Sequence, residues 1–449
     1  MPSKTPSELK VEYVGHACLL VEAQGERFLT DPWFTNPVMA NSWYHLPKYS
    51  REITEIPPLD FIYVSHEHAD HLDIPALRQL TPEATILFPK YHDGMMLATL
   101  QKARLTQKLL ALEDGEVFTT PQGNKLCINF SDTGAKDSSL VLTDGETCIY
   151  NHTDSWFTPG KMKKIGEKWN IDLAFQCYAG TGSFPSYMLW PLEYRIEVGK
   201  KKAIQLFERM RQTIEALSPK AYVPFAASFG YLRPENIWLN KIASTTPAEC
   251  VEWLASQGTK TPSVVLNHGD TWTKNQGANK GKVSHSIVIT EREIEEYSKY
   301  WAHTIELKRQ EEVVHPSLLP HLGEMFKNYL VAWASKEQGK FKNEKLKFRF
   351  NVAGDHDASW SVDFSKENDF VTKSVPYQPD VYLVLTETEV CNALLRRHYT
   401  FDDLYNSARI QMNRYPYNKY HQNFYDSFFG GWDDTKEITT NQDFVKRLL

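Results

Sequence analysis

The sequence predicts a mixed α/β protein of two domains, the first larger than the second. Its 449 residues exceed the usual size of a single domain. Up to about residue 310, short apolar strands with hairpin turns alternate with helical segments, an order that fits two sheets flanked by helices. Beyond that point a long helical segment precedes several strands and further helices. We therefore expect domains at residues 1–310 and 311–449, the second of a smaller α+β type.

The first domain is predicted to open with strands. Residues 10–35 show two alternating strands joined at Gln24-Gly25-Glu26, a hairpin signal. Residues 36–58 are an aromatic loop, which would either line a substrate pocket or pack as a surface loop. Further strands are predicted at 61–65, 85–88, 116–119, 125–130, 139–143, 147–151, 221–225 and 263–267. Helices are predicted near 74–80, 92–104 and 193–216.

The second domain follows a charged segment, 287–310, which is predicted to be a connecting helix. Its expected order is a helix at 318–333, strands at 345–352, 359–364 and 380–386, and helices beginning near Glu387 and Phe401. A dense aromatic stretch is expected to pack helices and the domain interface, and association between copies of the chain is an alternative role. This stretch consists of Tyr415, Tyr417, Tyr420, Phe424, Tyr425, Phe428, Phe429 and Trp432.

Composition excludes several classes of function. The net charge of −6 without a basic block argues against a nucleic-acid partner. The sequence has no apolar run of membrane-spanning length and no apolar signal core, so we expect a protein of the cytoplasm that does not enter the membrane. Its six cysteines lack paired spacing, and most of them are predicted to be buried free thiols. No Cys-x-His pair is present, although a Rieske cluster would need two.

One short stretch, residues 64–73, carries the strongest chemical signal. It follows the apolar run at residues 61–64 and has the order His66-x-His68-x-Asp70-His71. His66 and His68 alternate along an extended segment, so both rings can point to one side. Asp70 and His71 follow on a turn and can face a second point. Imidazole and carboxylate ligands in this order suit two transition-metal ions.

On these residues the sequence resembles the metallo-β-lactamase superfamily. Residues 13–21 (Tyr-Val-Gly-His-Ala-Cys-Leu-Leu-Val) and 28–34 (Phe-Leu-Thr-Asp-Pro-Trp-Phe) resemble its opening strands and first aspartate turn. Residues 63–71, 224–229 and 267–270 resemble the branch that contains the catalytic module of CMP-N-acetylneuraminate hydroxylase. The resemblance implies an αββα sandwich. The pattern of residues 311–449 resembles the sterol-carrier-protein-2-like domain that trails some members.

The resemblance also implies the remaining ligands. Asp154, after the strand at 147–151, would bridge both ions, and His268 would complete the second ion with Asp70 and His71. Asp70 and Asp154 are therefore the expected catalytic carboxylates. His152 is an alternative ligand of the first ion. His16 is expected in the core or behind the ligands, and Asp31 is expected to orient a ligand.

The chain departs from the superfamily's pattern at the first ion. Classical members place a third histidine ahead of the strand that ends before Asp154, but this chain has no histidine between His92 and His152. Asp137 is the best substitute and Asp132 the second choice. Two histidines with one carboxylate favour ferrous iron and leave positions open for dioxygen, whereas three histidines would favour zinc and hydrolysis.

Three functions follow as hypotheses. The first is a non-haem diiron oxygenase that hydroxylates a small or carrier-bound substrate and takes electrons from an external donor. Its cofactors would be two metal ions, with iron favoured over zinc or manganese. The second is a metal-dependent hydrolase of the phosphodiesterase, lactonase or amidase type, using a metal-bridging hydroxide. The third is a non-catalytic metal-site scaffold.

Overall fold

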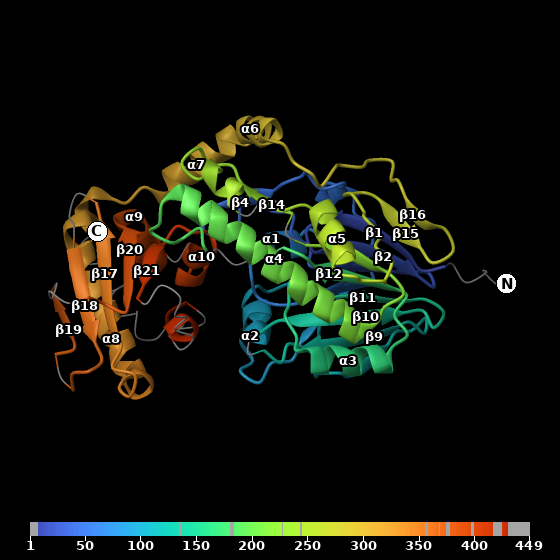
Figure 1. The fold of residues 1–449 in the computed structure, drawn as a ribbon, viewed down its shortest axis with the longest axis horizontal. Coiled ribbons are helices and arrows are strands. Elements are labelled where there is room, and N and C mark those ends of the chain that lie inside the picture. Colours follow the sequence, from blue (N-terminus) through green and yellow to red (C-terminus); the bar gives the residue numbers. More distant parts are fainter. Residues whose placement is uncertain are drawn as a thin grey trace. The chain divides into compact units, whose positions relative to one another are not determined.

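A computed structural model of the chain forms two compact units (Figure 1). The first unit comprises Met1–Val38, Trp43–Thr181 and Lys200–Ser298, and the second comprises Met39–Ser42, Gly182–Gly199 and Lys299–Leu449. The structure describes residues 8–133, 136–179, 184–226, 228–242, 245–354, 358–367, 369–373, 378–396, 399–415 and 424–429.

The first unit contains an eight-stranded sheet in the order β16-β15-β1-β2-β3-β5-β6-β7. Neighbouring strands are antiparallel from β16 to β3 and parallel from β3 to β7. Its strands are β1 (Lys10–Gly15), β2 (Cys18–Ala23), β3 (Glu26–Thr30), β5 (Phe61–Tyr63), β6 (Thr85–Pro89), β7 (Lys108–Leu112), β15 (Thr271–Thr273) and β16 (Gly277–Asn279).

A six-stranded sheet in the order β13-β12-β11-β10-β9-β8 faces the first. Its antiparallel part runs from β8 to β11, and β11, β12 and β13 are parallel. Its strands are β8 (Val117–Thr119), β9 (Lys125–Phe130), β10 (Ser138–Thr143), β11 (Cys148–Asn151), β12 (Leu173–Cys177) and β13 (Tyr222–Phe225). A small separate sheet pairs β4 (Trp43–His45) with β14 (Phe229–Tyr231).

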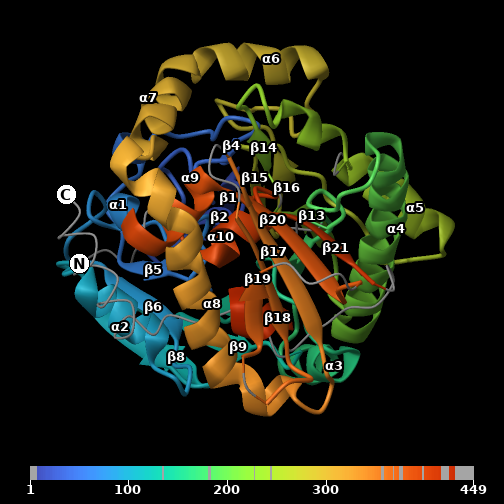
Figure 2. The same ribbon diagram turned by 90° about the vertical axis from the view of Figure 1, so that its left-hand side faces the viewer.

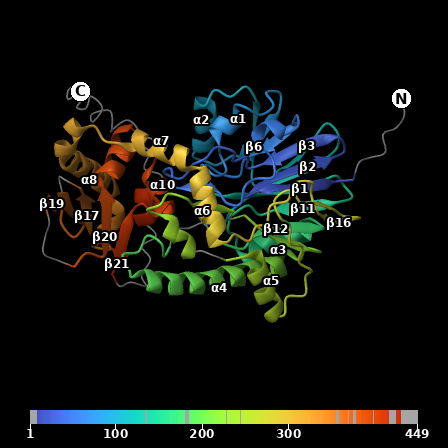
Figure 3. The ribbon, with the colours of Figure 1, turned by 90° about the horizontal axis from the view of Figure 1, so that it is seen from above.

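Helices cover both outer faces of this sandwich (Figure 3). Side chains of both sheets, such as Val21 and Ile128, form a shared core between them. On the far side of the larger sheet lie α1 (Ile74–Leu77) and α2 (Met95–Lys102). On the far side of the smaller sheet lie α3 (Pro159–Lys168), α4 (Leu192–Leu217) and α5 (Pro247–Ser256). The predicted mixed α/β sandwich with flanking helices is therefore confirmed.

Three of the segments predicted within residues 1–310 differ in the structure, and β4, β7, β12, β14, β15, β16, α3 and α5 were not predicted. Residues 10–35 form three strands instead of two, because the chain reverses at His16 without the polar or Gly-rich turn that marks Gln24-Gly25. Residues 263–267 are not a strand: Ser263 makes only an isolated bridge to Tyr222. The segment 287–310 is divided into α6 (Glu291–Tyr300) and α7 (Ala302–Glu312), since the backbone leaves the helical conformation at Trp301.

The second unit has a five-stranded sheet in the order β19-β18-β17-β20-β21, with α8 (Leu319–Phe341) packed against it (Figure 2). The indole of Trp333 on α8 contacts the rings of Phe348 and Phe350 on β17. The strands and short helices are β17 (Lys347–Ala353), β18 (Ala358–Asp363), β19 (Val371–Lys373), β20 (Val381–Thr386), β21 (Gln411–Arg414), α9 (Glu387–Cys391) and α10 (Phe401–Asn406).

The predicted helix and strands of the second unit are present, whereas β19 and β21 were not predicted. The likeness to a sterol-carrier-protein-2-like domain stays a prediction. In the aromatic stretch, Phe424 and Phe428 pack against the Trp333 ring, as expected for core residues. Tyr417, Tyr420 and Trp432 lie outside the described residues.

Two features of the whole chain bear on its environment. All six cysteines are buried free thiols, as predicted. Across the residues that the structure describes, none of the helices combines the length and the apolar character that crossing a bilayer requires.

Candidate metal centre

The predicted metal residues gather at the carboxyl ends of parallel strands from both sheets. Asp31 follows β3, the turn 65–71 follows β5, and Asp154 follows β11. In sheets with parallel strands this end is where loops from neighbouring strands converge. The sandwich therefore brings together side chains that are more than 120 residues apart in sequence.

The ligand turn is held in place by its backbone. The amides of His71 and Leu72 both donate to the carbonyl of His68, at 3.0 and 2.7 Å. At its far end Asp73 caps α1 by accepting from the amide of Ala76 at 2.9 Å, and it also accepts from the amide of Phe34 at 2.8 Å. Both carboxylate oxygens of Asp73 thus accept backbone hydrogen bonds, so they are not available to a metal ion.

His66, His68 and Asp154 form a first group of potential ligands. Nε2 of His66 lies 2.9 Å from Nδ1 of His68 and 3.8 Å from Oδ1 of Asp154. His66 and Asp154 are buried, whereas His68 is partly exposed. The structure thus brings together three of the residues that the sequence predicted for the first ion.

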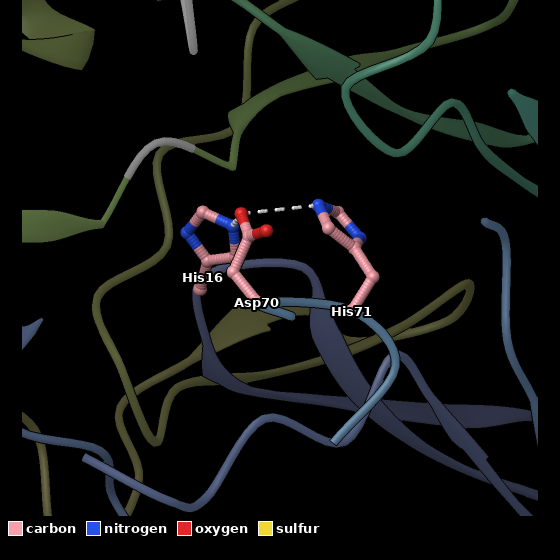
Figure 4. A group of neighbouring side chains, drawn as sticks. All are labelled: His16, Asp70 and His71. Carbon is pink, nitrogen blue, oxygen red and sulfur yellow. Dashed lines mark hydrogen bonds and ion pairs between the residues drawn. The ribbon is translucent and has the colours of Figure 1, made fainter. Parts of the chain in front are cut away.

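His16, Asp70 and His71 form a second group (Figure 4). Both imidazole rings are turned toward the carboxylate of Asp70, which lies between them. Its Oδ2 is 3.1 Å from Nε2 of His16 and 3.4 Å from Nε2 of His71. All three residues are fully or almost fully buried.

Asp154 lies between the two groups, as a bridging carboxylate should. Its Oδ1 is 3.8 Å from Nε2 of His66 in the first group and 3.5 Å from Nε2 of His71 in the second. One carboxylate therefore faces a histidine of each group, and its role as a bridge between two ions stays a prediction.

A hydrogen-bond chain fixes which ring nitrogens face the centre. Ser65 donates from its amide and its hydroxyl to the two carboxylate oxygens of Asp31, at 2.8 and 2.9 Å. Nδ1 of His71 donates to Asp31 at 2.9 Å, and Nδ1 of His66, 2.9 Å from the Ser65 oxygen, donates to it. With Nδ1 protonated in both rings, each Nε2 presents a lone pair. Asp31 therefore orients His71 directly and His66 through Ser65, two residues that the sequence predicted as ligands.

Burial and charge shift the pKa values of these groups strongly. Burial alone would lower the pKa of His71, but the carboxylates of Asp154, Asp70 and Asp31 raise it well above the ordinary value. Burial and the nearby His71 lower the pKa of His66 well below the ordinary value. Although burial opposes it, His71 and His66 hold the pKa of Asp154 far below the usual range. Three buried carboxylates thus surround His71, and a bound cation would offset the negative charge that they concentrate there.

Unsatisfied polar atoms support a cation at this centre. Among the described residues, Nε2 of His71, Oδ1 of Asp70 and Oδ1 of Asp154 are buried and have no hydrogen-bond partner. Buried polar atoms in native structures nearly always have partners, so each such group needs an explanation. Imidazole nitrogens and carboxylate oxygens are the ligands that zinc, iron and manganese accept. The residues present therefore fit metal binding.

The two candidates for the missing ligand of the first ion lie in different environments. Oδ1 of Asp137 is 4.0 Å from Nδ1 of His66, the ring nitrogen that does not face Asp154. Asp132 instead accepts from the amide of Thr158 at 2.8 Å and from its hydroxyl, at the start of α3. Asp137 is thus the nearer of the two, and its ligation stays a prediction.

His152 lies in an aromatic environment away from both groups. Its ring contacts those of Tyr150, Trp156 and Phe157, at centroid distances of 5.9, 6.2 and 5.4 Å. Burial lowers its pKa to about 4, so the ring is neutral near pH 7. The structure does not bring His152 into either group.

His268 is also not brought into a group, although the sequence predicted it as a ligand of the second ion. Its Nδ1 donates to the carbonyl of Lys48 at 3.0 Å, and its Nε2 lies 3.1 Å from the hydroxyl of Ser228. Burial lowers its pKa to about 3, so this ring too is neutral. In this structure His268 links the segments of Lys48 and Ser228 through hydrogen bonds, and its metal ligation stays a prediction.

His16 is the residue that sequence reasoning placed outside the ligand set. It lies in the turn between β1 and β2 with a positive φ of 47°, a backbone conformation that costs a non-glycine residue about 1–2 kcal/mol. Strained backbone of this kind is concentrated at functional sites. The Gly15-His16 pair was visible in the sequence, but nothing local places it beside Asp70, which is 54 residues away.

Part of the chain is similar to known proteins. Residues 10–135 match the β-lactamase superfamily domain. A Mycobacterium tuberculosis protein with a provisional Rieske 2Fe-2S name is 28% identical over 241 residues, which are 52% of this chain and 46% of that protein. The chain thus spans about half the length of the curated relatives that it first matches. Danio rerio cytidine monophosphate-N-acetylneuraminic acid hydroxylase is 22% identical over 442 residues, or 94% of this chain and 72% of the hydroxylase.

Two solved structures each align with part of this chain. CmlA, a diiron β-hydroxylase from Streptomyces venezuelae, is 19% identical over 58% of this chain and 53% of its own, with a TM-score of 0.39. Igni18, a metallo hydrolase from Ignicoccus hospitalis, is 18% identical over 60% of this chain and 98% of its own, with a TM-score of 0.41.

Proposed function

Because the chain carries a β-lactamase superfamily domain whose strand ends present two histidine–carboxylate groups, we propose that it is a dinuclear, iron-dependent oxygenase. Its substrate would be a small or carrier-bound molecule that becomes hydroxylated. His66, His68, Asp137 and Asp154 would hold the first ion, and Asp70, His71 and Asp154 would hold the second.

The presence of a carboxylate, Asp137, is the observation that favours an oxygenase over a hydrolase. In the sequence Asp137 stands in place of the third histidine of classical zinc sites, and in the structure its Oδ1 lies 4.0 Å from Nδ1 of His66. Two histidines and a carboxylate favour ferrous iron with open positions. The hydroxylase from Danio rerio, which aligns with 94% of this chain, supports the same choice by its name.

The protein's own residues would orient and protect the centre. The Asp31–Ser65 pair holds the Nδ1 protons of His66 and His71, so that each Nε2 can bind. Burial of Asp70 and His71 excludes water from one side, and partly exposed His68 marks the side from which a substrate can approach. Iron bound there would supply the redox chemistry that activates dioxygen, with electrons from a separate donor such as a reductase or ferredoxin.

Iron-loaded protein tests this proposal through its optical spectrum. We expect about two irons per chain and a spectrum that changes on anaerobic reduction and again when oxygen is admitted. Tightly held zinc, no redox response, and activity on a generic phosphodiester or lactone would instead make the protein a hydrolase.

Substitution at Asp137 tests the residue itself. Asp137→His should shift metal preference from iron toward zinc by at least about tenfold, because it restores a three-histidine set. Asp132→Asn is the matched control, because Asp132 accepts a hydrogen bond from the amide of Thr158. This substitution should leave the metal preference unchanged. Equal preferences in wild type and Asp137→His would remove the basis for choosing iron.

A further inference from the structure

The turn between β1 and β2 is built so that it presents a histidine to the buried side of the centre. A Cβ at Gly15 would collide with the ring of Tyr49, so only glycine lets the chain approach that ring. The next residue, His16, has its φ at 47° and a fully buried side chain. A close approach at Gly15 and a positive φ at His16 thus constrain two successive residues, and together they place an imidazole beside Asp70.

The spacing within the His16–Asp70–His71 group matches the edges of a coordination polyhedron. Metal–ligand bonds of about 2.0–2.1 Å around a tetrahedral ion place neighbouring ligand atoms about 3.3 Å apart. Oδ2 of Asp70 lies 3.1 Å from Nε2 of His16 and 3.4 Å from Nε2 of His71. In Figure 4 both rings turn their edges toward the same carboxylate.

His268 is engaged in a separate hydrogen-bond chain. Its Nδ1 donates to the Lys48 carbonyl, which leaves Nε2 to accept from the hydroxyl of Ser228 at 3.1 Å. The Ser228 oxygen is in turn 3.2 Å from the hydroxyl of Tyr13 on β1. Both ring nitrogens therefore have partners, and the ring links three segments around the centre.

We propose that His16 is a ligand of the second metal ion, together with Asp70, His71 and the shared Asp154. His268 acts as a positioning residue that ties the Lys48 loop to Ser228. This ligand set rests on the proposed dinuclear centre, because it needs a second ion to bind. It gives that ion two imidazoles and two carboxylates from residues that are buried in the first unit.

Cobalt titration of three single variants tests the assignment without measuring activity. His16→Asn removes the imidazole but suits the left-handed backbone. His268→Asn removes the ring that contacts Ser228. Asp31→Asn weakens the hydrogen bond that orients His71 and removes no ligand. Losing such an orienting residue costs about 10–100-fold in metal affinity. Metal-free protein is titrated with Co²⁺, the bound equivalents are read from visible absorption, and circular dichroism confirms that each variant is folded.

Wild type should bind two equivalents of Co²⁺. In His16→Asn the affinity for the second equivalent should fall by more than about 100-fold, further than in Asp31→Asn, while His268→Asn should still bind two. A smaller loss in His16→Asn, or a larger loss in His268→Asn than in His16→Asn, would overturn the assignment of His16. Fewer than two equivalents in wild type would instead refute the dinuclear centre itself.

Discussion

The two halves of the centre are built differently. His66 and His68 come from one extended segment and meet Asp154 across the sandwich, with His68 partly exposed. The other half unites Asp70 and His71 with His16 from a distant turn, and the three residues are 0–1% exposed. The first half thus includes a partly exposed side chain, whereas the second is buried.

This difference suggests that the two metal ions would have different roles. Catalytic metal sites keep a position open, while structural sites are closed by protein ligands. The His66–His68 side is therefore the side at which a substrate and an oxidant would meet. The closed His16–Asp70–His71 side would hold its ion as a fixed positive charge, which offsets the buried carboxylates.

Asp154→Asn should have the largest effect, because this carboxylate faces both halves. We expect loss of both ions at concentrations that saturate wild type, an affinity loss well beyond 100-fold, since removing a ligand costs more than removing a residue that orients one. Metal analysis after dialysis measures it. If the variant kept one ion at wild-type affinity, Asp154 would belong to one half only.

Asp31→Asn should have a moderate effect that is felt in both halves. Its carboxylate orients His71 directly and His66 through Ser65, at 2.9 Å in each contact. Affinity for each ion should fall about 10–100-fold, which isothermal titration of metal-free protein can resolve. An effect confined to one ion would show that the hydrogen-bond chain does not couple the halves.

Asp172→Asn should affect stability alone, because Asp172 anchors the end of β11 opposite to Asp154. It accepts from the Cys148 amide at 2.9 Å and pairs with Lys220 at 2.7 Å. Burial would raise its pKa, but Lys220, the Cys148 amide and Lys274 lower it. The free energy of unfolding should fall by about 1–2 kcal/mol at pH 7, with metal content unchanged.

The pH dependence of this effect has a definite sign. A lowered pKa in the folded state stabilises the protein above the unfolded value of about 3.9, and the contribution is lost as pH falls through the folded value. Urea unfolding should therefore separate wild type from Asp172→Asn at pH 7 and bring the two curves together toward pH 3. A constant gap, or one that widens in acid, would contradict the lowered pKa.

Sequence reasoning succeeded where the signal was local. The ligand turn follows a clear apolar strand, and the structure brings its His66 and His68 together. Asp154 was implied by the resemblance to the superfamily, which places an aspartate after such a strand. Asp31 was expected to orient a ligand, and it does contact His71. The expectation for His66 and His68 needed only a strand, its end and the alternation of side chains, whereas those for Asp154 and Asp31 also used the resemblance.

Residue contacts that depend on tertiary packing could not be predicted from the sequence. His16 reaches Asp70 only because β1 and β2 lie beside β3 and β5 in one sheet, a pairing that residues 13–21 do not reveal. The pairing of β4 with β14 joins residues more than 180 positions apart. The segment 263–267 is apolar enough for a strand, yet the backbone amides of its last residue, Asn267, and of the nearby Gly269 donate to Asp270 and Tyr13 instead.

The most direct test of the two-halved centre is a crystal structure of iron-loaded protein with anomalous diffraction at the iron edge. Two peaks are expected, one among His66, His68 and Asp154 and the other among His16, Asp70 and His71. A single peak, or a second peak bound by His268 with His16 remote from it, would contradict the two-halved centre.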